Sequence, residues 1–283
     1  MQNKNKSKSK EKNITKISLK NNEEIINELY NDIYGMFKKY YLKNQKKAKN
    51  IERYLRNKVK SFGNSNPIIH EIFKKNIKKD FRYNLLQIND KLNLAIKLLL
   101  NDYFEMKITS CNILNQIYSN ISRKQVEKLI KIIEEKNIIN EWATCDSLSS
   151  KFFKFYGLLS KDNTIYIANL GKSTNLWVRR ISLVSFVNRI KYNDEKPNFK
   201  GFIDLMYENI SRNVEYPEKF NQLAVGWLTR YLALIDYNRY EKWIFLNYNK
   251  LTREAIRYTV EKLNPEQKKR ILTYNNKNLD KNI

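Results

Sequence analysis

Glycine and proline are scarce in this sequence. The 283 residues include 6 Gly and 4 Pro. Turns rely on both residue types, and a β-sandwich or β-barrel needs many turns. The shortage therefore predicts an all-α fold. The chain is long enough for that fold to bury most of the surface that it exposes when unfolded.

Histidine and cysteine are scarcer still, which limits the available chemistry. His70 is the single histidine, and the only cysteines are Cys111 and Cys145. Without residues from a partner, these cannot form a histidine-based triad, a multi-histidine metal site or a zinc ribbon. The sequence also lacks the Gly-rich loop of P-loop and dinucleotide-binding folds. We therefore expect no metal and no cofactor, and an enzyme must work with carboxylates, arginines and aromatic rings.

Long apolar runs are also missing. The longest fall far short of the roughly 20 residues that a helix needs to span a bilayer, and the N-terminus has no apolar signal core. Two cysteines without a regular spacing favour a reducing compartment. These features predict no membrane partner and an intracellular protein, located in the cytoplasm or nucleoid of a bacterium or in the nucleus of a eukaryote.

What the sequence does contain is positive charge. Lys and Arg number 54 against 29 Asp and Glu, a net charge of +25. The first twenty residues, with seven lysines and one glutamate, carry +6, which leaves +19 on the rest. Such an excess favours a nucleic acid or, less often, an acidic membrane surface. The simpler alternative is a solvated, lysine-rich surface.

The sequence divides into a tail and a helical body. Residues 1–20 have few large apolar side chains and are predicted to be disordered. Residues 21–283 are predicted to form a single domain, because apolar residues recur at helical spacing along it. Helix pairs at roughly 35–45-residue spacing are typical of HEAT-like repeats. We therefore predict a curved α-solenoid. The expected helices include 140–156, 175–191, 199–210, 220–236 and 253–263, with further starts at Asn21, Asn66-Pro67 and Asn264-Pro265.

Trp142 and Asp146 form the first candidate site. They are four residues apart, so on a helix they share one face. An aspartate beneath an indole is unusual in a buried stripe. The structural alternative is that Asp146 caps a helix that begins at Ser147, with Trp142 simply packed in the core.

Arg180 interrupts an apolar stripe formed by Trp177, Ile181, Val184 and Val187. A guanidinium on a mostly buried face must have partners. It is either paired with a nearby acid, or laid along apolar surface with its head in water, or used as a phosphate clamp. The neighbouring Arg179 is predicted to lie on the polar flank of the same helix.

Trp227 lies in an apolar run, where a tryptophan usually belongs to the core. Gly226 beside it permits the close approach of another group. The pattern alone does not decide between a packed and a functional indole.

Four segments resemble the signatures of the AlkD-like family of DNA alkylation-repair glycosylases. They are 141–146 (EWATCD), 175–181 (NLWVRRI), 224–230 (AVGWLTR) and, in the C-terminal motif, 251–257 (LTREAIR). Their order and separations agree as well. The resemblance covers roughly 45 to 273 and implies a curved stack of HEAT-like helical pairs. The implied activity is excision of cationic alkylated purines of the 3-methyladenine and 7-methylguanine type from double-stranded DNA.

The resemblance also implies residue roles. Trp142 and Trp227 match the two tryptophans that contact the lesion, and Asp146 matches the catalytic aspartate. Arg180 matches the arginine that holds DNA near the lesion. The damaged base is expected to stay largely stacked instead of entering a pocket. We expect a monomer.

Further arginines in these motifs are candidates for DNA binding, namely Arg179, Arg230 and Arg253. The N-terminal region departs from the family pattern, because His70 lies near the place of a usual arginine. This departure concerns N-terminal DNA contacts more than the chemistry. Some relatives with this fold lack the catalytic residues, so a non-catalytic HEAT-like protein that recognises bent or branched DNA is the main alternative, although this chain keeps all four residues. An RNA-binding or protein-binding solenoid is a second.

Overall fold

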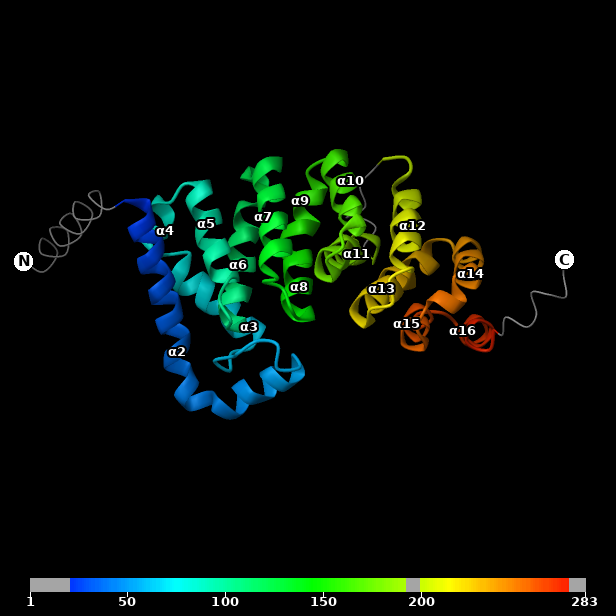
Figure 1. Cartoon of the computed structure of the whole chain (residues 1–283), viewed down its shortest axis with the longest axis horizontal. Helices are drawn as coiled ribbons and strands as arrows, with labels where there is room; N and C mark the ends of the chain where they lie inside the picture. The colour runs from blue at the N-terminus through cyan, green and yellow to red at the C-terminus, as the bar shows by residue number, and fades with distance from the viewer. Residues whose placement is uncertain (1–20, 192–198, 275–283) are drawn as a thin grey trace, which may run out of the picture. The chain divides into compact units, whose positions relative to one another are not determined.

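The computed structural model describes residues 21–191 and 199–274, and in this part of the chain the elements are all helices joined by loops, without a strand (Figure 1). The prediction of an all-α fold is confirmed. The predicted tail at residues 1–20 lies outside the described residues. The chain divides after Leu129 into two compact units, which are described separately below.

Unit 1 begins with a long helix whose start matches the sequence prediction. Asn21 caps α2 (Asn22–Tyr54) by accepting a hydrogen bond from the Glu24 amide. The unit continues with α3 (Asn66–Ile72), a π-helical turn η1 (Phe73–Ile77), α4 (Phe81–Leu85), α5 (Ile88–Leu99), α6 (Phe104–Ile117), η2 (Tyr118–Asn120) and the first half of α7 (Arg123–Lys136). α5 packs extensively against α6, and α2 packs against α5.

A buried carboxylate organises the loop before α3. Glu105 is fully buried on α6 and accepts hydrogen bonds from the Ser61 hydroxyl at 2.8 Å and from the amides of Phe62 and Asn64 at 3.0 and 2.9 Å. Burial raises the pKa of Glu105, while these donors oppose the shift. The predicted cap of α3 is one residue displaced, because the N-cap is Ser65 and Asn66 is already helical.

Unit 2 contains the segments that resemble the repair glycosylases. It runs through α8 (Trp142–Leu148), a second π-helical turn η3 (Ser149–Phe153), α9 (Lys154–Leu158), α10 (Lys161–Asn169), η4 (Leu170–Lys172), α11 (Leu176–Lys191), α12 (Phe202–Asn213), α13 (Lys219–Ile235), α14 (Tyr237–Leu246), η6 (Tyr248–Lys250), α15 (Arg253–Thr259) and α16 (Pro265–Leu272). α11 packs against both α8 and α13, and α13 packs against α15.

Most helix boundaries in unit 2 lie close to the predictions. Thr252 caps α15 and Asn264 caps α16, the latter in a reciprocal capping box with Gln267. α15 ends at Thr259, earlier than the predicted 263. Pairs of packed helices are what a helical repeat requires. The predicted curvature concerns the arrangement of the units and stays a prediction.

Gly226 allows α13 and α15 to approach closely, as its position beside Trp227 suggested. A Cβ placed on Gly226 would lie 2.6 Å from the Ala255 carbonyl oxygen and 3.0 Å from the Tyr258 Cβ. The first distance is shorter than a Cβ tolerates and the obstacle is backbone, while the second is a tight contact. The contact of these two helices therefore depends on the missing side chain.

We predict that Gly226→Ala destabilises unit 2 by about 1–3 kcal/mol, because α15 must move away. Gly35→Ala is the matched control, since Gly35 lies within α2 with open space around its Cβ position. There the substitution should be neutral or stabilise by about 0.5–1 kcal/mol. Thermal unfolding followed by circular dichroism measures both, and an unchanged midpoint for Gly226→Ala would contradict the close contact.

Candidate active site

Asp146 and Arg180 are bound to each other. The Arg180 Nε and Nη2 donate to the two Asp146 carboxylate oxygens at 2.8 and 2.9 Å, a bidentate ion pair between α8 and α11. The remaining Arg180 Nη1 donates to the Phe220 carbonyl on α13 at 2.6 Å. One guanidinium thus joins three helices.

The pair lies at the boundary between core and surface. The Arg180 side chain is 6% exposed and that of Asp146 is 17% exposed. Burial lowers the pKa of the Arg180 guanidinium, but the Asp146 carboxylate outweighs this effect, so the net pKa is raised and the group stays charged. Because the Asp146 side chain is more exposed than that of Arg180, water or a ligand has access to the carboxylate but hardly to the guanidinium.

The alternative role of Asp146 as a helix cap is wrong. α8 begins at Trp142, and its cap is Glu141, whose carboxylate accepts from the amides of Ala143 and Thr144. Glu141 is itself buried. Asp146 lies within the helix, so its carboxylate is available for Arg180 instead of the helix terminus.

The two tryptophans of the predicted site are both half-buried. Trp142 precedes Asp146 by one turn of α8 and shares its face. Trp227 follows Phe220 by two turns of α13, on the same face and about 10 Å further along the helix axis. The Phe220 ring in turn lies 5.9 Å from the Arg180 guanidinium carbon. Trp177, by contrast, belongs to the buried stripe, 5.4 Å from the Phe220 ring.

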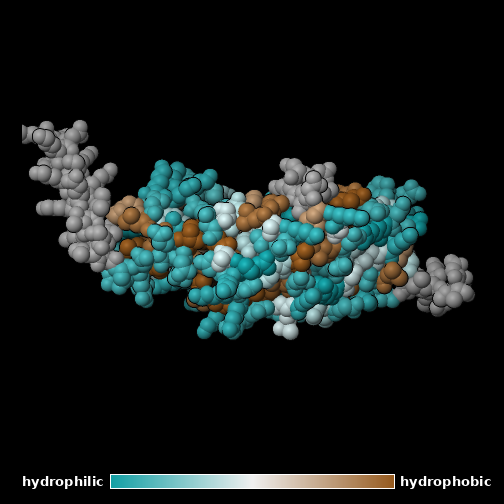
Figure 2. Space-filling view, turned by 90° about the horizontal axis from the view of Figure 1, so that it is seen from above, coloured by the Kyte–Doolittle hydropathy of each residue, from teal (hydrophilic) through white to brown (hydrophobic). Residues whose placement is uncertain are grey.

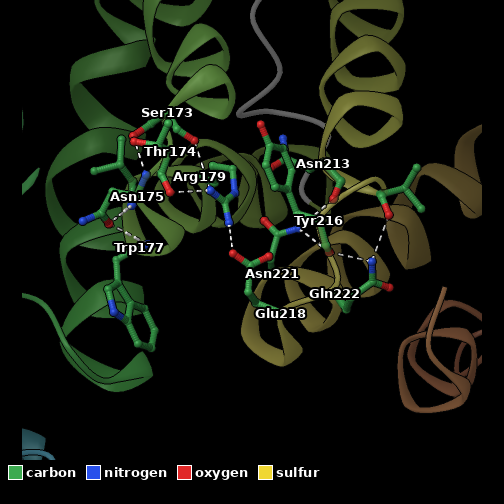
Figure 3. Close-up of polar contacts among 12 residues, drawn as sticks. Ser173, Thr174, Asn175, Trp177, Arg179, Asn213, Tyr216, Glu218, Asn221 and Gln222 are labelled. Atoms are coloured by element: carbon green, nitrogen blue, oxygen red, sulfur yellow. Dashed lines mark hydrogen bonds and ion pairs between the residues drawn. The ribbon is translucent and has the colours of Figure 1, made fainter. Parts of the chain in front are cut away.

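Arg179 is buried, so the prediction that it lies on the polar flank is wrong. It is 1% exposed and donates to the carbonyls of Ser173 and Thr174 and to the Glu218 carboxylate (Figure 3). Its guanidinium carbon lies 3.8 Å from the centre of the Tyr216 ring. Arg179 therefore ties the start of α11 to the start of α13, and no exposed donor supports a DNA contact.

The segment that receives Arg179 is itself fixed by buried amides. Asn221 donates to the Asn213 carbonyl at 2.6 Å, and Gln222 donates to the carbonyls of Val214 and Tyr216 (Figure 3). Asn221 and Gln222 are fully buried, so loss of these bonds would leave polar groups unsatisfied. These bonds position the first turn of α13, including the Phe220 carbonyl that Arg180 uses.

The other two arginines that were predicted to bind DNA differ in exposure. Arg230 is 7% exposed, and it donates to the Tyr258 carbonyl and pairs with Glu261. Arg253 is exposed at the first position of α15 and donates to the Tyr248 hydroxyl and the Leu272 carbonyl. Arg253 alone among Arg179, Arg230 and Arg253 presents its guanidinium to solvent.

A cysteine nucleophile does not fit this site. Cys145 is fully buried and directs its sulfur to the Trp177 carbonyl at 3.5 Å. Burial, with a further contribution from Asp146, raises the pKa of the Cys145 thiol well above its usual value. The thiol is therefore neutral and unreactive.

Neither a metal site nor a membrane span accompanies these residues in the part of the chain that the structure describes. It contains no group of three or more His, Cys, Asp or Glu side chains placed to hold a metal ion. Among the described helices, none is both long and apolar enough to cross a bilayer.

The fold is all-α, and its site has a carboxylate on α8 that is held by a buried arginine on α11 and lies one helical turn from a half-buried indole. The family model described as "DNA alkylation repair enzyme" matches residues 40–263, and the chain belongs to this family. The solved structure of a predicted DNA alkylation repair enzyme from Enterococcus faecalis is similar in fold. Its TM-score is 0.64 at 20% identity, and the match covers 78% of this chain and 97% of that one. Among curated proteins there is no match.

We predict that Arg180→Met costs about 3–5 kcal/mol of folding stability, because it leaves the mostly buried Asp146 carboxylate without its counter-ion. The double variant Asp146→Leu/Arg180→Met should recover most of that loss, since two apolar groups replace both charges. Urea unfolding of the wild type, both single variants and the double variant measures the coupling. Additive effects of the two substitutions would show that the ion pair does not hold the site.

Proposed function

We propose that this protein is a DNA glycosylase that excises cationic alkylated purines, of the 3-methyladenine and 7-methylguanine type, from duplex DNA. Membership of the DNA alkylation repair family supplies the general role in repair. The observation that carries the finer proposal is the bidentate Asp146–Arg180 pair, which fixes one carboxylate at the border of the solvent beside Trp142.

The chemistry of the leaving group suits this residue set. A purine alkylated at N3 or N7 carries a positive charge, which weakens its glycosidic bond. When the C1′–N bond breaks, its electron pair moves to the purine, and the base leaves neutral. No acid is needed to protonate it, so a site without histidine suffices. What remains is to stabilise the positive charge on the sugar and to direct a water molecule at C1′.

Asp146 has the capacity for both tasks. A carboxylate offers about four lone-pair positions, and Arg180 occupies two of them. The others are available to accept a hydrogen bond from the attacking water, whose oxygen forms the new bond to C1′ while one of its protons passes to the carboxylate. The negative charge of the carboxylate also stabilises the positive charge that develops on the sugar. Arg180 fixes the orientation of Asp146 in this proposal.

The expected contact of Arg180 with a DNA phosphate stays a prediction. All three Arg180 donors that form hydrogen bonds in the structure are directed at Asp146 or Phe220. A phosphate contact requires the guanidinium to give up the Phe220 carbonyl or to share Nη1 with the phosphate. We therefore assign Arg180 to the positioning of Asp146 first, and leave Arg253 as the exposed arginine for the DNA backbone.

The two indoles would serve the same transition state. An aromatic face attracts a cation by about 0.5–2 kcal/mol, depending on how dry the contact is. Trp142 and Trp227 are half-buried, so each has a ring surface that packing does not fully cover. We propose that they pack against the lesion nucleotide from α8 and α13, without enclosing the base. Bulky adducts are then accepted.

The surface is suited to a polyanion. The net charge is +25, and Figure 2 shows a face on which hydrophilic residues predominate, with smaller apolar patches between them. Neutralising phosphates releases the counterions that surround the duplex. Binding should therefore depend strongly on ionic strength.

We predict that Asp146→Asn abolishes release of 7-methylguanine while binding of duplex DNA persists. The amide keeps the shape but removes the charge that stabilises the sugar cation. Single-turnover assays on methylated duplex DNA, with chromatography of the free base, provide the measurement. Asp162→Asn is the control, because Asp162 is an exposed acid of the same unit on α10. Excision at the wild-type rate by Asp146→Asn would refute the proposal.

The same assay separates the alternatives. If the wild type releases no base but binds bent or branched DNA, the protein is a non-catalytic DNA-binding member of the family. If it prefers single-stranded RNA to duplex DNA, the RNA-binding alternative is correct.

We also predict that affinity for duplex DNA falls steeply with salt. If about six phosphates are neutralised, the association constant decreases by about a thousandfold between about 50 and 200 mM salt. Fluorescence anisotropy with a labelled, undamaged duplex gives the slope. A flat dependence would exclude the positively charged surface as the main source of affinity.

A further inference from the structure

A cavity in unit 1 has a lining unlike the Asp146 site. Its volume is about 520 Å³, and four of its lining residues are His70, Lys74, Lys78 and Lys91. Asparagine and glutamine side chains supply further polar groups, and no carboxylate occurs among the described residues that line it. A cavity of this size is in the range of small-molecule sites. Its charge favours an anion.

The basic residues reach one cavity because of the local helix geometry. His70, Lys74 and Lys78 are spaced by four, and the chain changes from α3 to the π-helical turn η1 between them. The Lys78 amide donates to the Phe73 carbonyl five residues earlier, at 2.9 Å. Four residues are more than one turn of an α-helix and less than one turn of a π-helix. The two angular deviations therefore cancel, and the three side chains stay on one side of the chain. π-Helical turns are frequent at functional sites.

Neighbouring acids do not neutralise these cations. Glu71 pairs with Lys75 at 2.5 Å, and Asp80 pairs with Arg82 at 2.7 Å. Lys74 and Lys78 are exposed next to them. The positive potential of the cavity is therefore left for a ligand.

The inner wall of the cavity, which includes Tyr83 and Gln116, carries polar groups in fixed orientations. The buried Tyr83 donates its hydroxyl to the Gln116 Oε1 at 2.7 Å, which fixes the amide and leaves its NH2 group as a donor. Lys91 lies over the Tyr83 ring, 5.1 Å from its centre. The His70 Nδ1 is shielded from solvent and has no hydrogen-bond partner in the described structure. The His70 side chain itself lines the cavity, where the rest of its ring can contact a ligand.

We propose that this cavity binds one phosphorylated nucleotide, with the phosphate at Lys74, Lys78 and His70 and the base edge at the amides of the inner wall. Lysine is a common phosphate ligand, and fixed amides recognise the donor and acceptor edge of a base. The same chemistry is present in a free nucleotide and in a 5′-phosphorylated end of a DNA strand. The site lies in unit 1 and is independent of the proposed chemistry at Asp146.

Calorimetry with adenosine monophosphate tests the first source. Lys74→Ala/Lys78→Ala should weaken binding at least about tenfold. The matched control is Lys124→Ala/Lys128→Ala, which removes two exposed lysines at the same spacing from α7 within unit 1. The control should stay close to the wild type, since it changes the net charge equally but not the cavity.

Hairpin DNA with and without a 5′-phosphate tests the second source. If the end is the ligand, the phosphate increases affinity for the wild type and the control, but not for Lys74→Ala/Lys78→Ala. Binding of either probe that depends on the cavity lysines supports the proposal and identifies the source. Equal losses in both lysine variants, or no binding of the nucleotide and no effect of the 5′-phosphate in the wild type, would overturn it.

Discussion

The bidentate contact between Asp146 and Arg180 is the constraint on which the site depends. Two charges largely removed from water are tolerable only when their geometry is good and their remaining hydrogen-bonding groups are satisfied. Here the carboxylate uses both oxygens, and the guanidinium adds the Phe220 carbonyl on a third helix. A shift of α8, α11 or α13 would break one or more of these hydrogen bonds. The ion pair therefore holds the three helices in place, and the helices in turn hold the ion pair.

The two consecutive arginines at the start of α11 contact different partners. Neighbouring residues on a helix point about 100° apart. Arg180 therefore reaches α8 and the first turn of α13, whereas Arg179 reaches Glu218 and the loop before α11. Both side chains are buried. Their common effect is to hold α13 against α11, and Asp146 is left as the accessible member of the set.

Several features of this arrangement were predictable from short-range patterns. The stripe of Trp177, Ile181, Val184 and Val187 is buried as expected, and the arginine that interrupts it has the partners that burial requires. Local patterns misled where two candidates competed. Glu141 caps the helix that contains Asp146, although Asp146 was considered as the cap of a helix beginning at Ser147, and Arg179 is buried although it was predicted to lie on the polar flank. Helix capping and the burial of a charge depend on which partner lies within hydrogen-bonding distance in the folded protein. Neither residue spacing nor composition predicts that distance.

The sequence by itself determined the helical fold, the basic character and the residue types that the chemistry must use, because scarcity of Gly, Pro, His and Cys and the periodicity of apolar residues are local properties. Only the tertiary structure decided which acid meets which arginine. The Phe220 carbonyl is a backbone acceptor with no signature in the sequence, and the cavity at His70 needs side chains from four helices (α3, α4, α5 and α6) and a π-helical turn. Such sites arise from contacts between distant segments, and these contacts exist only after the helices have packed.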